Sequence, residues 1–205
     1  KVFYYKGDLK KIHTLKNINN SYDFVFNASG YGGISNKDNN KKTYNTHYFG
    51  LKNIIKKTKG PKLKKFIQFG SSNEYGNCNA PQKETMICKP KNSYGLAKYK
   101  CTKLLLNMYK KNKFPFVILR LFQVYGPYQN ENRIIPYVIR KSKKNEEIII
   151  TKGEQNRDFC YIDDVIDAIF KCLNNKKTNG EIINLGLGKS IKIKNVVMII
   201  VKKLR

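Results

Sequence analysis

The 205-residue sequence contains few acidic residues, few arginines and no long apolar run. Lys and Arg together number 41 against 14 Asp and Glu, which gives a formal net charge of +27. Only five of the 41 are arginines, and the lysines are spread along the whole chain, whereas proteins that read bases and phosphates favour clustered Arg. Nucleic-acid binding is therefore disfavoured as the main role, although the positive charge would attract an anionic substrate.

Features of membrane, secreted and metal-binding proteins are missing as well. No apolar stretch approaches the length of a membrane span, and the opening residues KVFYYKGDLK have no signal-peptide layout. The five cysteines are odd in number and lack the spacing of a metal site or a disulfide framework. We therefore expect a folded cytoplasmic protein with free thiols, no membrane association and no metal site.

Runs rich in β-forming residues alternate with helical patterns. Strands are predicted at 2–7, 23–29, 65–71, 114–122, 146–151, 157–162 and 181–186, and helices at 43–58, 92–112, 133–144, 163–174 and 193–204. The early strands are hydrophobic nearly throughout, as strands of a parallel sheet covered on both faces are. The pattern predicts an α/β fold, with a Rossmann-type doubly wound parallel sheet over 1–125 and a smaller mixed α/β lobe over 126–205.

A glycine-rich phosphate loop of the form G-x-G-x-x-G is absent from the sequence. NASGYGG (27–33) is rich in glycine and follows a predicted strand, but no clear helix opens after it, so a flexible loop is an equally good interpretation. The chain opens on a predicted strand with no preceding unit and stops inside an amphipathic helix. Both ends suggest an interior fragment that would bind a dinucleotide poorly by itself.

One predicted helix carries a lysine at the edge of its apolar face. At about 100° per residue, 92–112 forms an apolar stripe of Ala97, Cys101, Leu104, Leu105 and Met108. Lys98 lies at the edge of this stripe, one turn after Tyr94. An ammonium held beside a phenol stabilises the phenolate and lowers a pKa that is ordinarily about 10, which suits acid/base catalysis. A core-edge tyrosine with a snorkelling lysine is the structural alternative.

A second candidate segment, FGSSNEYG (69–76), directly follows the predicted strand KFIQF. Its residues would emerge at the carboxyl end of a parallel strand, where open α/β sheets bind ligands. Small hydroxyls there can hydrogen-bond a substrate oxygen, although a Ser-Ser pair can also simply cap a turn. RLFQVYGP (120–127) and NRDFCYIDD (156–164) follow at fitting distances.

Together, GSS-x-E-Y-G, Y-G-x-x-K, L-R-L-F-Q-V-Y-G-P and R-D-F-x-Y-I-D-D-V resemble the extended short-chain dehydrogenase/reductase family. Within it they are similar to the NAD-dependent nucleotide-sugar epimerases, dehydratases and 4-keto reductases. The resemblance runs from GDL (7–9) to NLGLG (184–188), and the family's glycine-rich loop lies upstream of GDL. It implies NAD or NADP as cofactor, a nucleoside-diphosphate sugar as substrate and a homodimer at full length. Residues 1–125 would bind the dinucleotide and 126–205 the substrate.

The resemblance also implies roles for single residues. Tyr94 would be the acid/base at a sugar oxygen, Lys98 would lower its pKa and hold the nicotinamide ribose, and Ser71 would hydrogen-bond the reacting oxygen. The other cofactor matches are Asp8, Leu9, Ala28, Ser29 and His47. The substrate matches are Ser72, Asn73, Gln123, Asn132, Arg133 and, at the diphosphate, Arg157.

Two departures from the family pattern bear on the reaction. The 4,6-dehydratases follow the Ser/Thr with an Asp-Glu pair, but Ser72 and Asn73 stand here, and neither titrates near neutral pH. Glu74 comes one residue late, and alternation along an extended segment would aim it elsewhere. His47 replaces the family's usual Asn at the cofactor, although a histidine can still donate a hydrogen bond there.

These observations favour hydride transfer at a sugar carbon by an epimerase or a 4-keto reductase. Three alternatives stay open at this point. One is a 4,6-dehydratase in which Glu74 acts as the acid. The others are a catalytically inactive sugar-nucleotide-binding module and a basic nucleic-acid-binding protein.

Overall fold

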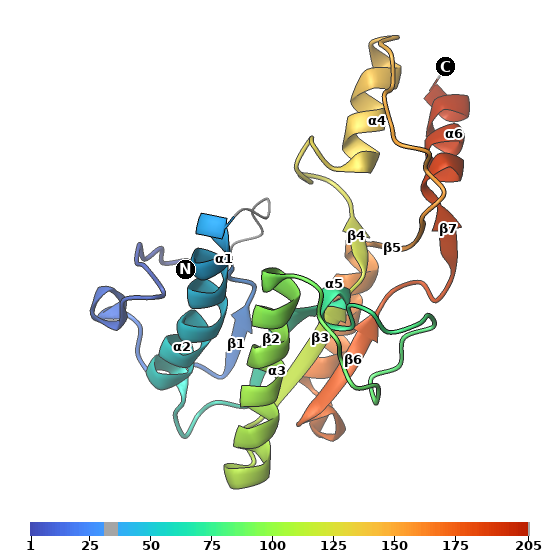
Figure 1. Cartoon of the computed structure of the whole chain (residues 1–205). Coiled ribbons are helices and arrows are strands. Elements are labelled where there is room, and N and C mark those ends of the chain that lie inside the picture. The colour runs from blue at the N-terminus through green and yellow to red at the C-terminus, as the bar shows by residue number, and fades with distance from the viewer. Residues whose placement is uncertain (31–36, 205) are drawn as a thin grey trace. The chain divides into compact units, whose positions relative to one another are not determined.

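The computed structural model describes residues 1–30 and 37–204, which form two compact units (Figure 1). Residues 1–121 and 169–184 make up the first unit, and residues 122–168 with the segment from Leu185 onward make up the second. The sequence had placed 169–184 in the second lobe. They belong to the first unit because the strand at 181–185 joins the first sheet. The dinucleotide and substrate roles of the two parts stay predictions.

The first unit is built on a four-stranded sheet, in the order β1 (Phe24–Asn27), β2 (Lys65–Ser71), β3 (Phe116–Leu121) and β6 (Glu181–Leu185). β1 and β3 both run parallel to β2. Nearly every side chain of β2 and β3 is buried, as expected for central strands of a parallel sheet, and the buried side chains include the polar Lys65, Gln68 and Arg120. The predicted Rossmann-type α/β fold is confirmed, with flanking helices and a second mixed sheet.

Helices cover one face of this sheet (Figure 1). The chain from 37 to 58 is one helical stretch, made of α1 (Lys37–Tyr44), a π-helical turn (Asn45–Phe49) and α2 (Gly50–Thr58), and α3 (Ser93–Asn112) follows β2. The main core joins α2, α3, β2 and β3 through side chains that include Leu51, Leu105, Phe66 and Phe116. Within the described ranges, none of the helices is both long and apolar enough to cross a bilayer.

The second unit contains a three-stranded mixed sheet in the order β4 (Gln123–Tyr125), β5 (Asn156–Tyr161) and β7 (Ser190–Lys192). β4 runs parallel to β5, and β7 runs antiparallel to it. The helices are α4 (Ile134–Lys143), α5 (Ile162–Leu173), whose last residues belong to the first unit, and α6 (Ile193–Leu204). α4 packs against α6.

Two predicted strands are wrong and two real strands were missed. Residues 2–7 have no sheet neighbour among the described residues, and Tyr4 is 91% exposed. Residues 146–151 are also outside the sheets, and the Ile149 N–H donates to the Tyr137 hydroxyl (3.2 Å) instead of a ladder partner. β-forming composition makes a strand only where a neighbouring strand supplies hydrogen bonds. β4 and β7 have three residues each, too few to show alternation.

Candidate functional site

Ser71 is the last residue of β2 and begins the 3₁₀ turn Ser72–Glu74. Its Oγ accepts a hydrogen bond from Asn73 N (3.2 Å), and its backbone N–H donates to Glu74 Oε1 (3.0 Å). This reciprocal capping box fixes the serine at the carboxyl end of a parallel strand, where the sequence predicted it. Its O–H can still donate to the oxygen of a ligand.

Tyr94 and Lys98 lie in the first two turns of α3. Lys98 is 5% exposed, and its Nζ lies 5.7 Å from the centroid of the Tyr94 ring. The ammonium donates to the backbone oxygen of Phe69 (2.8 Å), two residues before Ser71. Burial lowers the pKa of Lys98, while Cys101 and Glu74 act in the opposite direction. The effect of this ammonium on the Tyr94 phenol stays a prediction.

The start of α3 packs directly on the serine turn. A Cβ added to Gly95 would lie 2.4 Å from the backbone oxygen of Asn73, so only glycine permits this approach. Together with the bond from Lys98 to Phe69, this contact gathers Ser71, Tyr94 and Lys98 at one end of β2. The structure therefore brings the three predicted catalytic residues into one neighbourhood.

His47 lies in the π-helical turn, is 5% exposed, and packs edge-on against the Tyr94 ring. Single π-helical turns inside helices are frequent at functional sites. The ring also packs on Gly30, where an added Cβ would lie 1.8 Å from His47 Cε1 and where φ is +153°. His47 was predicted as a cofactor contact; its position beside Tyr94 links it equally to the acid/base pair.

Two of the predicted cofactor residues, Leu9 and Ser29, line an open groove of about 710 Å³ beside β1. The rest of its lining is mostly apolar and includes Tyr5, Val25 and Ile54, which suits a flat ring such as adenine. Ala28 is exposed next to it, and Asp8 accepts from Lys10 N (3.0 Å), a bond that lowers the pKa of its carboxyl. Residues 31–33 of the NASGYGG segment lie outside the described residues. The residues present thus fit the adenosine end of a dinucleotide.

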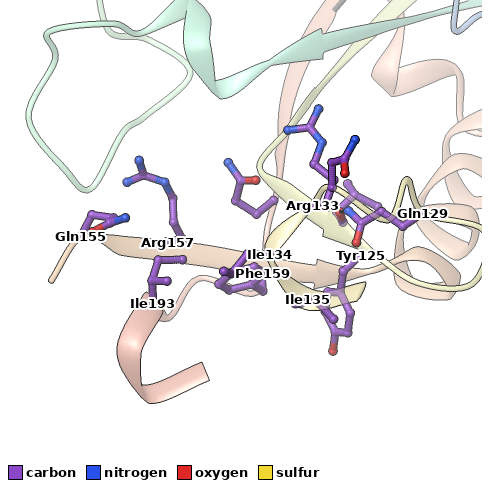
Figure 2. A pocket seen from close by; sticks show the side chains of 12 residues that line it. Tyr125, Gln129, Arg133, Ile134, Ile135, Gln155, Arg157, Phe159 and Ile193 are labelled. Carbon is purple, nitrogen blue, oxygen red and sulfur yellow. Dashed lines mark hydrogen bonds between the residues drawn. The ribbon is translucent and has the colours of Figure 1, made fainter. Parts of the chain in front are cut away.

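The second unit contains a cavity of about 250 Å³ (Figure 2). Four residues that the sequence predicted to bind substrate line it: Gln123, Asn132, Arg133 and Arg157. The guanidinium group of Arg157 donates to its neighbour's backbone oxygen, Asn156 O (2.8 Å). Among the described lining residues there is no carboxylate, so the two guanidinium groups are available to an anionic ligand.

Sequence reasoning missed several residues of this cavity, among them Gln155, Phe159, Tyr125 and Ile193. Arg157 and Phe159 are two residues apart in β5, and Gln155 comes immediately before this strand; all three line the cavity (Figure 2). A step of two residues in each direction from Arg157 would have identified Gln155 and Phe159. Ile193 begins α6, and no pattern in the sequence connects it with Arg157.

The remaining predicted substrate residues are in the serine turn. Ser72 is partly exposed and Asn73 is exposed, whereas the side chain of Glu74 is 0% exposed and forms an ion pair with Arg120 (3.1 Å). The turn therefore presents hydroxyl and amide groups to a ligand, and its single carboxylate points into the interior.

Comparisons with known proteins agree with this geometry. The model of the "NAD dependent epimerase/dehydratase family" matches residues 1–186. The chain is 30% identical to a dTDP-D-glucose 4,6-dehydratase of Dictyostelium discoideum, over 89% of this chain and 46% of that protein. It is 47% identical to a CDP-abequose synthase of Salmonella muenchen, over 43% of this chain and 30% of that protein. The chain thus spans about half the length, or less, of these curated relatives.

Solved structures of similar proteins include two epimerases. A UDP-N-acetylglucosamine 4-epimerase from Methanobrevibacter ruminantium M1 is 28% identical, with a TM-score of 0.82 over 94% of this chain and 62% of that one. A UDP-glucuronic acid 4-epimerase from Bacillus cereus, solved with UDP-glucuronic acid and NAD, is 29% identical, with a TM-score of 0.80 over 95% and 62%. The resemblance predicted from the sequence is confirmed at the level of the family.

Proposed function

Because the chain belongs to the NAD dependent epimerase/dehydratase family, we propose that the protein modifies a nucleoside-diphosphate sugar by hydride transfer at a sugar carbon, as an epimerase or a 4-keto reductase. One observation carries the proposal. The buried ammonium of Lys98 lies over the Tyr94 ring and is bonded to Phe69 O, two residues before Ser71. A phenol beside a fixed cation, close to a small hydroxyl, suits proton transfer at a sugar oxygen.

In the proposed reaction, Tyr94 exchanges a proton with the C4 oxygen of the sugar or the oxygen of a neighbouring carbon. The Ser71 hydroxyl donates a hydrogen bond to the same oxygen, which stabilises the charge that develops there. Lys98 stabilises the phenolate form of Tyr94. When bound, NAD or NADP supplies the hydride acceptor or donor.

The cofactor is held by residues of the first unit. Leu9 and Ser29, which line the groove beside β1, contact the adenosine end together with Asp8 and Ala28. Lys98 and His47 hold the nicotinamide ribose end. The mainly apolar groove lining and the position of Lys98 support this assignment.

The substrate's diphosphate is held in the cavity of the second unit. Arg133 and Arg157 form charge-assisted hydrogen bonds with it, while the amides of Gln123 and Asn132 bind polar groups of the nucleotide sugar. Support comes from the grouping of all four side chains around one cavity that lacks a carboxylate among its described lining residues. Two similar structures are epimerases of UDP-sugars, which makes UDP-sugars the first substrates to test.

The proposal includes two further points about the whole protein. The five cysteines are free thiols, which supports a location in the reducing cytoplasm. A homodimer is the expected assembly, and light scattering of the complete polypeptide tests it.

The 4,6-dehydratase alternative has support from the Dictyostelium discoideum relative. The resemblance implies that a 4,6-dehydratase has an acid and a base at the positions of Ser72 and Asn73 to eliminate water, and no titrating group stands there in this chain. Glu74 cannot replace them, because its carboxylate is fully buried and paired with Arg120. The geometry therefore favours epimerisation or reduction over dehydration.

The test is to incubate the complete polypeptide with a panel of nucleoside-diphosphate hexoses and 4-keto sugars, with NAD or NADPH. An epimerase gives a product of unchanged mass, a reductase consumes NADPH, and a dehydratase gives a product that has lost water. We expect one of the first two, and we expect Tyr94→Phe to abolish it. No turnover in any assay, with sugar-nucleotide binding that is unchanged in Tyr94→Phe, would instead identify a non-catalytic binding module.

A further inference from the structure

The carboxylate of Glu74 is fully buried, accepts three hydrogen bonds and forms an ion pair. Oε1 accepts from the backbone N–H of Ser71 (3.0 Å). Oε2 accepts from Thr102 Oγ1 (2.7 Å) and from Arg120 Nε (3.1 Å), and it forms an ion pair with Arg120 Nη2 (3.1 Å). One side chain therefore connects the end of β2, the middle of α3 and the buried strand β3.

These bonds join the two elements that carry the proposed catalytic groups. Thr102 follows Lys98 by four residues and Tyr94 by eight, so the three lie on one face of α3. Through Thr102, Glu74 holds this face against the turn that begins at Ser71. The bond from Lys98 Nζ to Phe69 O (2.8 Å) is a second link between the same two elements.

Close packing restricts the position of the Glu74 carboxylate. A Cβ added to Gly70 would lie 2.7 Å from Glu74 Oε1, so the strand closes tightly on the carboxylate. On the other side, the guanidinium carbon of Arg120 lies 4.6 Å from the centroid of the Tyr75 ring, which fixes the ion-pair partner. Stability alone does not explain this arrangement, since well-packed apolar residues commonly match or exceed a buried ion pair.

We propose that Glu74 is a positioning residue, which sets the separation of the Ser71 hydroxyl and the Tyr94 phenol by binding Ser71 N and the Thr102 hydroxyl with one carboxylate. The inference rests on the proposed function, in which Ser71 and Tyr94 engage the same sugar oxygen. Both groups must then reach that oxygen at hydrogen-bond distance, and a misplacement of about 1 Å costs about 100-fold in rate. The negative charge of Glu74 also raises the pKa of Lys98 against the effect of burial.

The test compares Thr102→Val with Thr102→Ser in the complete polypeptide. Valine keeps the shape of threonine but cannot donate to Glu74, whereas serine keeps the hydroxyl. Thr102 is two turns away from Tyr94 and is not placed in contact with substrate or cofactor. We expect Thr102→Val to lower kcat about ten-fold with KM changed less than about two-fold, and Thr102→Ser to keep kcat within about two-fold of the wild type.

A matched control is Ser142→Ala, which removes another buried hydroxyl, one that has no hydrogen-bond partner among the described residues and lies far along the sequence in α4. It should leave kcat unchanged. If Thr102→Val keeps the wild-type kcat, or raises KM without lowering kcat, the positioning role is wrong. Equal losses in Thr102→Val and Ser142→Ala would also overturn it, because the effect would then be general.

A second measurement does not depend on turnover. Hydrogen exchange at the Ser71 amide, followed residue by residue by NMR, reports the bond to Glu74 directly. Thr102→Val should speed this exchange while Ser142→Ala leaves it unchanged. Unchanged exchange in Thr102→Val contradicts the inference even in an active enzyme. Faster exchange in a protein without any turnover supports the Glu74 contacts and rejects the proposed function instead.

Discussion

The rings of His47 and Tyr94 are packed edge to face, with centroids 5.3 Å apart and planes inclined by 74°. Such pairs contribute about 0.5–1.5 kcal/mol beyond the area they bury. The contact connects the π-helical turn with the helix of the proposed acid/base pair. His47 can therefore act in two ways, through its ring as packing and through its nitrogens as a cofactor contact.

His47→Phe separates these two contributions. Phenylalanine keeps an aromatic ring against Tyr94 but has no nitrogen to hydrogen-bond the cofactor. We expect the KM for NAD to rise about ten-fold, as the loss of one buried hydrogen bond predicts, with kcat at saturating NAD little changed. Steady-state kinetics with varied NAD measure this. His13→Phe, at an exposed position, is the control, and an unchanged KM in His47→Phe would leave His47 with packing alone.

Lys98→Met tests the role of the buried ammonium. Methionine fills a similar volume without the charge, so Tyr94 loses the cation beside its ring, and we expect kcat to fall by about 100-fold or more. Turnover assays on the complete polypeptide measure the loss. A matched substitution at the exposed Lys100 of the same helix should have no effect. Activity near the wild-type level in Lys98→Met would reject the proposed acid/base pair.

Lys98→Met also tests how the buried ammonium of Lys98 affects the pH dependence of the free energy of unfolding. Burial lowers the pKa of Lys98 from its ordinary 10.5, so the unfolded chain binds this proton more tightly than the folded one. Burying the charged ammonium therefore destabilises the folded state by its full amount at pH values below the folded pKa of Lys98. This destabilisation decreases as the pH rises from there toward 10.5. Urea unfolding of wild type and Lys98→Met over this range should show the wild type gaining stability relative to the variant. A constant difference would contradict it.

The sequence predicted the elements that hold these residues better than the contacts between them. The period of the α3 helix placed Tyr94 and Lys98 on one face, and the apolar runs predicted β2 and β3, because burial on both faces leaves a local pattern. The partners of Glu74 left no such pattern, since Arg120 is 46 residues away in the chain and only the fold joins them. The false strand at 2–7 has the same cause, because strand formation depends on a neighbour that composition does not reveal.

Arg157→Met tests the cavity of the second unit. If Arg157 binds the diphosphate, its loss should raise the KM for the sugar nucleotide by about ten- to 100-fold and leave kcat nearly unchanged, because a diphosphate contact serves the ground state and the transition state alike. The KM of the wild type should also rise with salt concentration, and that of the variant should rise less steeply. Lys143→Met removes an equal charge from an exposed position of the same unit and should change neither. A fall in kcat with unchanged KM would contradict this role.

Cys101 offers a test of the packing under the proposed site that needs no substrate. Burial raises the pKa of its thiol to about 12, and its Sγ lies 3.4 Å from the backbone oxygen of His47. Since only the thiolate reacts with alkylating reagents, Cys101 should remain unmodified by iodoacetamide at pH 8–9 in the folded protein, while the partly exposed Cys78 reacts.

The raised pKa of Cys101 also has a consequence for stability. The folded protein binds the proton of this thiol more tightly than the unfolded chain does. The resulting stabilisation of the folded state is fully present below the unfolded pKa of 9.0 and is lost as the pH rises toward about 12. Cys101→Ala should therefore lose less stability than the wild type over that interval, measured by urea unfolding.

In the labelling experiment, peptide mass spectrometry identifies which thiols react with iodoacetamide, and in 6 M urea all five should react at the rate of free cysteine. Rapid labelling of Cys101 without denaturant would mean that α3 does not close over the π-helical turn, and the contact between His47 and Tyr94 would then lose its support.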